Sequence, residues 1–145
     1  MKWYSDASYL VSAFGEDSNT LEAKRWLRQC ADFPILITRL TVLEAETALR
    51  AAVADGRLTQ EKMQAAMADI HRSVLEGHLQ RKDVPHHQWF PQGHRISMHA
   101  TTGCVCRALD VLHVAAAVIV KAKGMLTFDK HQRELAKAEG LEVAP

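Results

Sequence analysis

Apolar residues dominate one long stretch of the chain, from Ala108 to Val120 (ALDVLHVAAAVIV). The stretch is long enough for about three and a half helical turns, and a helix that is apolar on nearly all sides is typically buried. Two polar residues interrupt it, Asp110 and, one turn later, His113. An ionised carboxylate in such a helix is costly unless a cation or several hydrogen-bond donors meet it. Asp110 therefore either pairs within its own helix, with Arg107 or His113, or belongs to a site at the edge of the core.

The remaining apolar pattern predicts short strands that alternate with helices. Strands are expected at 2–6, 35–37, 125–128 and 141–143, with an extended segment at 82–85. Besides the long apolar stretch, helices are expected at about 7–14, 18–30, 41–54, 60–79 and 130–139, and in part of 86–102. This alternation is typical of an α/β fold with a mainly parallel sheet. Because no repeat, low-complexity tract or long linker divides the 145 residues, we expect one domain over 1–145.

Composition narrows the class of protein without naming a function. Hydrophobic residues make up 48% of the chain and the formal net charge is only +1, so any nucleic-acid footprint must be local. The N-terminus lacks the pattern of a signal peptide, and Lys121 ends the longest apolar run before it could span a bilayer. The three cysteines have no disulfide-framework spacing, so we expect them to pack as thiols in a reducing compartment. These features predict a cytoplasmic protein that does not cross a membrane.

Four acidic residues are placed where a parallel sheet binds its ligands, beyond the carboxyl ends of the strands. Asp6 and Asp129 follow predicted strands, Glu44 lies early in a helix that follows a strand, and Asp110 lies in the buried helix. Four carboxylates gathered at one end of a sheet repel one another unless a cation lies among them. Mg²⁺ and Mn²⁺ prefer oxygen ligands of this kind. The pattern therefore predicts a divalent-metal site.

Each of these acids also has a purely structural explanation. Asp6 and Asp129 each precede a predicted helix and could cap it, and Thr41 and Glu44 have the spacing of a capping box. The two explanations are compatible, because a capping bond fixes the direction in which a carboxylate points. Capping alone, however, does not explain why all four acids are expected at one end of the sheet.

Four segments resemble PIN-domain proteins, specifically the VapC-like toxins of bacterial toxin–antitoxin pairs: YSDAS (4–8), LTVLEAE (40–46), RALDVLHVAAA (107–117) and MLTFDKHQRELAKAEGLEV (125–143). They match in order, in approximate spacing and in chain length. The most specific feature is the helix with Asp110 and His113, followed within about twenty residues by a Thr-x-Asp segment. The chain departs from the family at residues 131–133, where an aromatic residue is common, and residues 55–106 carry no matching motif.

The resemblance implies a PIN-like three-layer fold in which a short parallel sheet is flanked by helices. It also implies a metal-dependent endoribonuclease that uses Mg²⁺ or Mn²⁺, often works as a homodimer and is held inactive by a cognate antitoxin. The implied metal cluster comprises Asp6, Glu44, Asp110 and Asp129, with Ser8 and Thr127 as supporting hydroxyls. Four basic residues near the acids could bind RNA phosphates, or could equally be counter-charges to the acids: Arg39, Arg107, Lys130 and Arg133.

Three other interpretations remain open at this stage. The chain could be a non-catalytic PIN-like binding module, which sequence alone does not exclude. It could be a receiver-type signalling domain, although that class needs paired acids after its first strand and a late Lys. A zinc site is a third interpretation, since the required residue types gather in one span, but their spacing matches no closed zinc pattern: His86, His87, His94, His99, Cys104 and Cys106.

Overall fold

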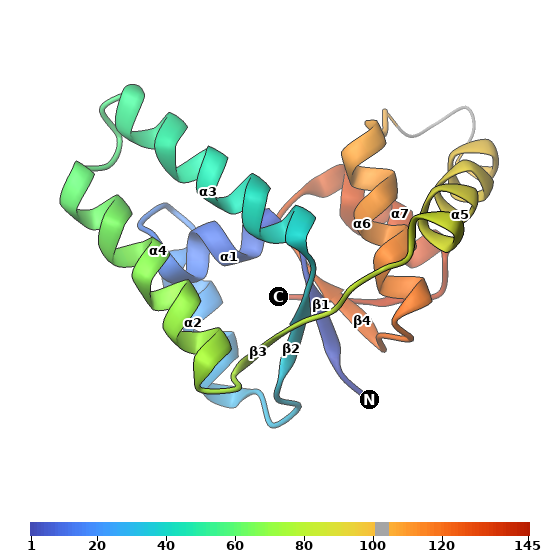
Figure 1. Ribbon diagram of the computed structural model, residues 1–145, viewed down its shortest axis with the longest axis horizontal. Helices are drawn as coiled ribbons and strands as arrows, with labels where there is room; N and C mark the ends of the chain where they lie inside the picture. Colours follow the sequence, from blue (N-terminus) through green and yellow to red (C-terminus); the bar gives the residue numbers. More distant parts are fainter. Residues whose placement is uncertain (101–104) are drawn as a thin grey trace.

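The computed structural model describes residues 1–100 and 105–145. Within these residues five strands alternate with seven helices (Figure 1). The strands are β1 (Trp3–Ser5), β2 (Ile35–Ile37), β3 (Leu79–Arg81), β4 (Gly124–Leu126) and β5 (Glu142–Ala144). The helices are α1 (Ala7–Phe14), α2 (Thr20–Gln29), α3 (Arg39–Ala54), α4 (Gln60–Leu75), α5 (His86–His99), α6 (Ala108–Ile119) and α7 (Lys130–Ala138).

The strands form one sheet in the order β3-β2-β1-β4-β5, and every neighbouring pair is parallel. Chain order reverses at β1, where β2 and β3 lie on one side and β4 and β5 on the other. Such a reversal opens a crevice outside the carboxyl ends of the central strands. The prediction of an α/β fold with a parallel central sheet is confirmed, and the crevice lies beside β1 and β4.

Alternating side chains of the central strands pack into two separate cores. Trp3, Ile35 and Ile37 contribute to the core with α1 to α4, whereas Tyr4 and Met125 contribute to the core with α6 and α7. This division follows from the strand geometry, because successive side chains point to opposite faces. In Figure 1, α1 to α4 lie to the left of the sheet and α5 to α7 to the right. The result is the expected three-layer arrangement.

The long apolar stretch forms α6, as predicted, and seven of its twelve residues are buried. The Ala115–Ala117 segment is fully buried (0% exposed). These small side chains allow α6 to approach the sheet and α5 closely. Asp110 and His113 are also buried, at 4% and 0% exposure, so both polar groups need partners inside the protein.

Two predicted helix boundaries are wrong for local reasons. Helix α3 begins at Arg39 rather than at residue 41, because Thr38 is its N-cap and forms a reciprocal capping box with Thr41. Helix α4 ends at Leu75, not near residue 79, because Gly77 adopts a left-handed conformation with φ of 80°. The chain then enters β3, which the apolar pattern did not predict.

No helix among the described residues is long and apolar enough to cross a membrane. Cys30 is a free thiol that packs at the edge of the core formed with α1 to α4. Cys106 is disulfide-bonded, so the expectation that the cysteines are all packing thiols is wrong for this residue. Cys104 lies outside the described residues.

Candidate functional site

A cleft of about 450 Å³ opens at the carboxyl edge of the sheet, between α1 and α3 on one side and α6 and α7 on the other. All four predicted acids line it: Asp6, Glu44, Asp110 and Asp129. These residues are far apart in the sequence, and each is contributed by a different segment. The topology therefore brings together the four carboxylates that the sequence analysis selected.

Asp6 directly follows β1 and is the most deeply buried of the four acids, with 1% exposure. It is the N-cap of α1, since Oδ1 accepts a hydrogen bond from the Tyr9 backbone N–H at 3.0 Å. Two hydroxyls also donate to it, Ser8 Oγ at 2.8 Å from Oδ1 and Thr127 Oγ1 at 2.5 Å from Oδ2. The Asp6 carboxylate therefore caps α1 and also lines the candidate site.

The two hydroxyls are themselves oriented by the backbone of the segment after β4. Ser8 Oγ accepts from the Phe128 N–H at 3.0 Å, and Thr127 Oγ1 accepts from the Asp129 N–H at 3.0 Å. Each hydroxyl has one proton, and because its lone pairs face a backbone N–H, that proton is directed at Asp6. Ser8 and Thr127, the two hydroxyls selected from the sequence, thus both contact Asp6.

Burial raises the pKa of the Asp6 carboxyl above its ordinary value, because desolvation disfavours the charged form. His113 opposes this rise most strongly, followed by the hydrogen bonds from Thr127, Tyr9 and Ser8. The protein alone does not fully compensate the buried charge. A cation in the cleft would supply the remaining compensation.

Asp110 and Asp129 lie on the opposite wall of the cleft, at the N-terminal ends of α6 and α7. Asp129 Oδ1 caps α7 by accepting from the Gln132 N–H at 2.9 Å. Asp110 Oδ2 accepts from the Arg107 backbone N–H at 3.0 Å and also lies 3.6 Å from Arg107 Nε. The Arg107 guanidinium reaches Asp129 as well, at 4.0 Å. The intrahelical pairing of Asp110 with Arg107 is therefore present, whereas the pairing with His113 is not observed.

Gln132 is a cleft residue that the sequence analysis did not select. Its side chain is 5% exposed, and Nε2 donates to Asp110 Oδ1 at 3.3 Å. Its carbonyl oxygen Oε1 is buried and has no hydrogen-bond partner among the described residues. The reverse amide orientation would place that oxygen against the Asp110 carboxylate, so the charge of Asp110 fixes the orientation seen. The only signal in the sequence was its position three residues after Asp129.

Glu44 lies in the second turn of α3, which excludes the predicted capping box with Thr41, because Thr41 pairs with Thr38 instead. The Glu44 side chain is 26% exposed, and its Oε2 forms a short hydrogen bond with His113 Nε2. His113 Nδ1 lies 2.9 Å from the Tyr4 hydroxyl. His113 is thus a buried histidine whose two nitrogens both have partners, and Nε2 faces the candidate site.

The donor set fits a hard divalent cation, because all four acids and the unpaired Gln132 carbonyl offer oxygen atoms. In the side-chain positions described, no group of three or more His, Cys, Asp and Glu residues surrounds one point as metal ligands do. Each carboxylate points instead to its own protein donors.

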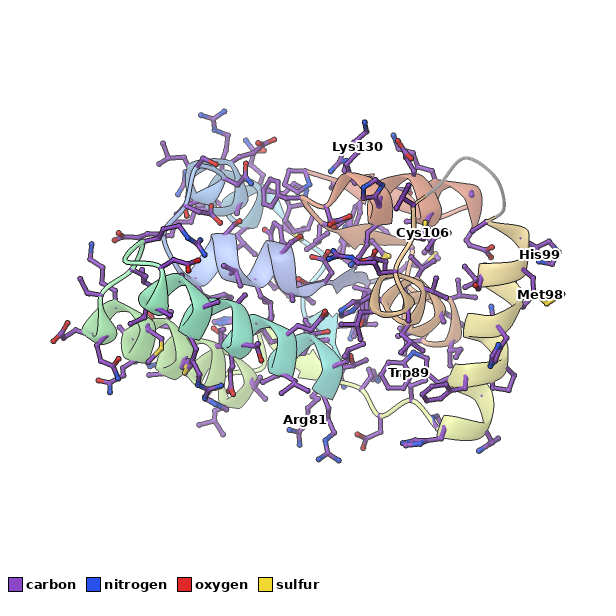
Figure 2. The ribbon with its side chains drawn as sticks, turned by 90° about the horizontal axis from the view of Figure 1, so that it is seen from above. Arg81, Trp89, Met98, His99, Cys106 and Lys130 are labelled. Carbon is purple, nitrogen blue, oxygen red and sulfur yellow. The ribbon has the colours of Figure 1, made fainter. Side chains whose placement is uncertain are left out.

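The four basic residues considered for RNA binding have three different environments. Arg107 lines the cleft and its side chain is 76% exposed. Arg39 and Lys130 are exposed but do not line the cleft, and Figure 2 shows Lys130 pointing outward from α7. Arg133 donates to the carbonyls of Thr127 and Pro145, at 2.8 and 2.9 Å. Its guanidinium therefore joins Pro145 to the segment after β4.

The histidines considered for zinc are distributed along α5, outside the acidic cleft. His86, His87, His94 and His99 are all exposed, and His99 points away from the molecule on the outer side of α5 (Figure 2). His99 Nδ1 also lies 2.7 Å from the carbonyl of Arg95. The described part of this span shows no arrangement suited to a closed zinc site.

Comparison with known proteins identifies the family. A family model for the PIN domain matches residues 4–138, so the chain belongs to the PIN-domain family. This assignment confirms the resemblance seen in the sequence and leaves no place for the receiver-type alternative. No curated protein matches the sequence.

Two solved structures have the same fold. The first, VapC20 from Mycobacterium tuberculosis, is described as a sarcin-ricin loop cleaving toxin; it is 17% identical over 97% of each chain, with a TM-score of 0.71. The second, FitAcB from Neisseria gonorrhoeae, is 17% identical over 98% of this chain and 96% of that chain, with a TM-score of 0.68. At this level of identity the likeness establishes the fold.

Proposed function

We propose that this protein is a metal-dependent endoribonuclease that hydrolyses RNA phosphodiester bonds. The single observation that carries the proposal is the convergence of four carboxylates, from four distant segments, on one cleft at the carboxyl edge of the sheet. Membership of the PIN-domain family supports it. Burial also raises the pKa of Asp6, because it disfavours the charged carboxylate, and a bound cation would offset that cost.

Asp6 and Asp129 would be the leading ligands of Mg²⁺ or Mn²⁺, because capping bonds hold both rigidly beside strand ends. Glu44 and Asp110 would complete the set directly or through water. When bound, the cation would polarise a phosphate oxygen and lower the pKa of an attacking water. Ser8 and Thr127 would keep Asp6 ionised and correctly oriented, since both of their protons are directed at it.

Arg107 is the best placed of the proposed RNA-binding residues. Its guanidinium lies at the wall of the cleft, within 4.0 Å of Asp129, yet is mostly exposed. A phosphate that approached the acids would therefore meet a positive charge at the entrance. Arg39 and Lys130, outside the cleft, would contact the RNA further from the cleaved bond.

We further infer that the protein is the toxin of a toxin–antitoxin pair, located in the cytoplasm and active as a homodimer. The shared fold with VapC20, itself described as a toxin, supports this class. The partners would be an RNA substrate and a cognate antitoxin that binds the protein and silences it. The other candidate, a non-catalytic PIN-like binding module, needs none of the four acids in the cleft.

An RNA cleavage assay tests the proposal. We expect the purified protein to cut RNA internally in the presence of Mg²⁺ or Mn²⁺, and we expect EDTA to stop the reaction. The double variant Asp6→Asn, Asp129→Asn should fold but lose cleavage, whereas Arg50→Gln, a control that changes an exposed charge on α3, should cut normally. Undiminished cleavage by the double variant would refute the assignment of the site. Metal binding without any cleavage of RNA would favour the binding module.

A further inference from the structure

A buried polar network lies behind Glu44 and connects it to the centre of the sheet. His113, on α6, and Tyr4, on β1, are both fully buried at 0% exposure. The two His113 nitrogens face different partners, Nε2 facing Glu44 on α3 and Nδ1 lying 2.9 Å from the Tyr4 hydroxyl. One imidazole ring therefore connects α3, α6 and β1, which belong to the two helix layers and the sheet between them.

One arrangement of protons pairs every donor of this network with an acceptor. The Tyr4 hydroxyl lies 3.1 Å from Thr38 Oγ1 and 3.2 Å from Thr41 Oγ1. The Thr41 hydroxyl donates to the carbonyl of Ser5, at 3.3 Å, so its proton is already used. Thr38 can donate to Tyr4, which leaves the Tyr4 proton free for His113 Nδ1.

The Tyr4 hydroxyl donates that proton to His113 Nδ1 across 2.9 Å. His113 Nδ1 is then an acceptor, so the neutral ring carries its proton on Nε2. Nε2–H in turn donates to the Glu44 carboxylate, a charge-assisted bond of the stronger kind. This chain of donors has one direction, from Thr38 through Tyr4 and His113 to Glu44.

Holding one oxygen of Glu44 determines what the other can do. Glu44 Oε2 is bound by His113, whereas the described residues form no hydrogen bond or ion pair with Oε1. Glu44 also lines the acidic cleft, and its side chain is 26% exposed. The carboxylate is thus anchored on its buried side and open on its cleft side, as a carboxylate that binds a cation through one oxygen would be.

We propose that Tyr4 and His113 are positioning residues for Glu44: the Tyr4 hydroxyl fixes His113 as the Nε2–H tautomer, and Nε2–H turns one Glu44 oxygen into the cleft. The proposal rests on the proposed function for the identity of the cation. Hydrogen-bond partners of metal ligands typically change metal affinity by about 10-fold to 100-fold when they are removed. An ordinary core histidine would affect folding alone.

Two substitutions of His113 separate these roles. Gln places an amide N–H close to the position of Nε2, whereas Leu fills the buried space without a donor. We expect His113→Leu to weaken Mn²⁺ binding by about 10-fold to 100-fold and His113→Gln to stay within about threefold of the wild type. Binding is measured by titration calorimetry with Mn²⁺ alone, and thermal unfolding reports stability. Equal Mn²⁺ affinity in a folded His113→Leu variant and the wild type would overturn the proposal.

Tyr4 offers a second test with a matched control. Tyr9 is also buried, at 1% exposure, and its hydroxyl donates to the Ala23 carbonyl at 2.9 Å, in the other core. Tyr4→Phe and Tyr9→Phe therefore remove one buried hydroxyl each, and Tyr9→Phe keeps the backbone N–H that caps Asp6. We expect both to lose stability, but only Tyr4→Phe to weaken Mn²⁺ binding, by about 10-fold. A parallel effect of both variants on Mn²⁺ affinity would contradict the proposal.

The tautomer itself is accessible by ¹⁵N NMR of the metal-free protein, which distinguishes protonated from unprotonated ring nitrogens. We expect His113 to carry its proton on Nε2 in the wild type and its Nδ1 resonance to shift in Tyr4→Phe. A proton on Nδ1 of a neutral ring would overturn the proposal even if every variant binds Mn²⁺ weakly. If the wild type cleaves no RNA, the proposed function fails, while the NMR result still decides whether the network is arranged as described.

Discussion

Replacing Thr127 by Val tests how the buried charge of Asp6 is held. The two side chains have nearly the same shape, so the change removes Oγ1, which donates to Asp6 at 2.5 Å and accepts from the Asp129 N–H at 3.0 Å. A hydrogen bond to a charged group contributes about 1.5–3 kcal/mol, and an unpaired backbone N–H adds about 1 kcal/mol. We therefore expect Thr127→Val to lose about 3 kcal/mol. For a domain of this size that lowers the unfolding midpoint by roughly 10 °C.

Thr127→Ser is the matched control, because it keeps the hydroxyl and loses one methyl group, worth about 1 kcal/mol. The assay is urea unfolding of both variants in EDTA, followed by calorimetric titration with Mn²⁺. We expect Thr127→Val to be the less stable variant by about 2 kcal/mol and to bind Mn²⁺ about 10-fold more weakly. If the two variants unfold at the same urea concentration and bind Mn²⁺ equally, the Thr127 hydroxyl does not support Asp6 and the reasoning is wrong.

Three further predictions concern other contacts of the site. Burial raises the pKa of Asp6 in the folded protein, so the folded state holds this proton more tightly than the unfolded state does. The stability of the metal-free protein should therefore fall as the pH rises from about 4 through the raised pKa. Urea unfolding should show this fall in the wild type and not in Asp6→Asn. Arg133→Met should lower the free energy of unfolding by about 2 kcal/mol, because it removes the hydrogen bonds to Thr127 and Pro145. A midpoint of thermal unfolding equal to that of the wild type would show that these bonds do not stabilise the protein. Gln132→Met removes one bond and one unpaired carbonyl together, so stability should change by less than about 1 kcal/mol; calorimetry should nevertheless show Mn²⁺ binding about 10-fold weaker.

The parts of the site that depend on local rules could be predicted from the sequence. Asp6 and Asp129 follow buried strands and cap helices, and both the strand pattern and the capping preference are read within a few residues. Helix α6 was equally predictable, because an apolar run of that length has few alternatives to a buried helix. The error at the start of α3 has the same local origin, since Thr38 and Thr41 are both good capping residues and only their contacts decide between them.

The parts that depend on tertiary contacts could not be predicted. His113 is 69 residues from Glu44 and 109 from Tyr4 in sequence, and no periodicity connects them. Gln132 is similar, because a Gln in the first turn of a helix is usually exposed, and only the packing of α7 against α6 buries it beside Asp110. Polar residues of this kind gain their roles from the topology that places them.

The sequence left capping and metal binding as alternative explanations of the four acids. In the structure the two explanations are compatible. Asp6 and Asp129 accept backbone N–H groups at helix N-termini, where the partial positive charge favours a carboxylate. Asp110 accepts hydrogen bonds from Arg107 and Gln132, and Glu44 is hydrogen-bonded to His113. Each acid thus has its own donors, so that the fold tolerates four neighbouring acids before any cation arrives. The protein should therefore remain folded when metal is removed, and metal binding should change its activity far more than its secondary structure.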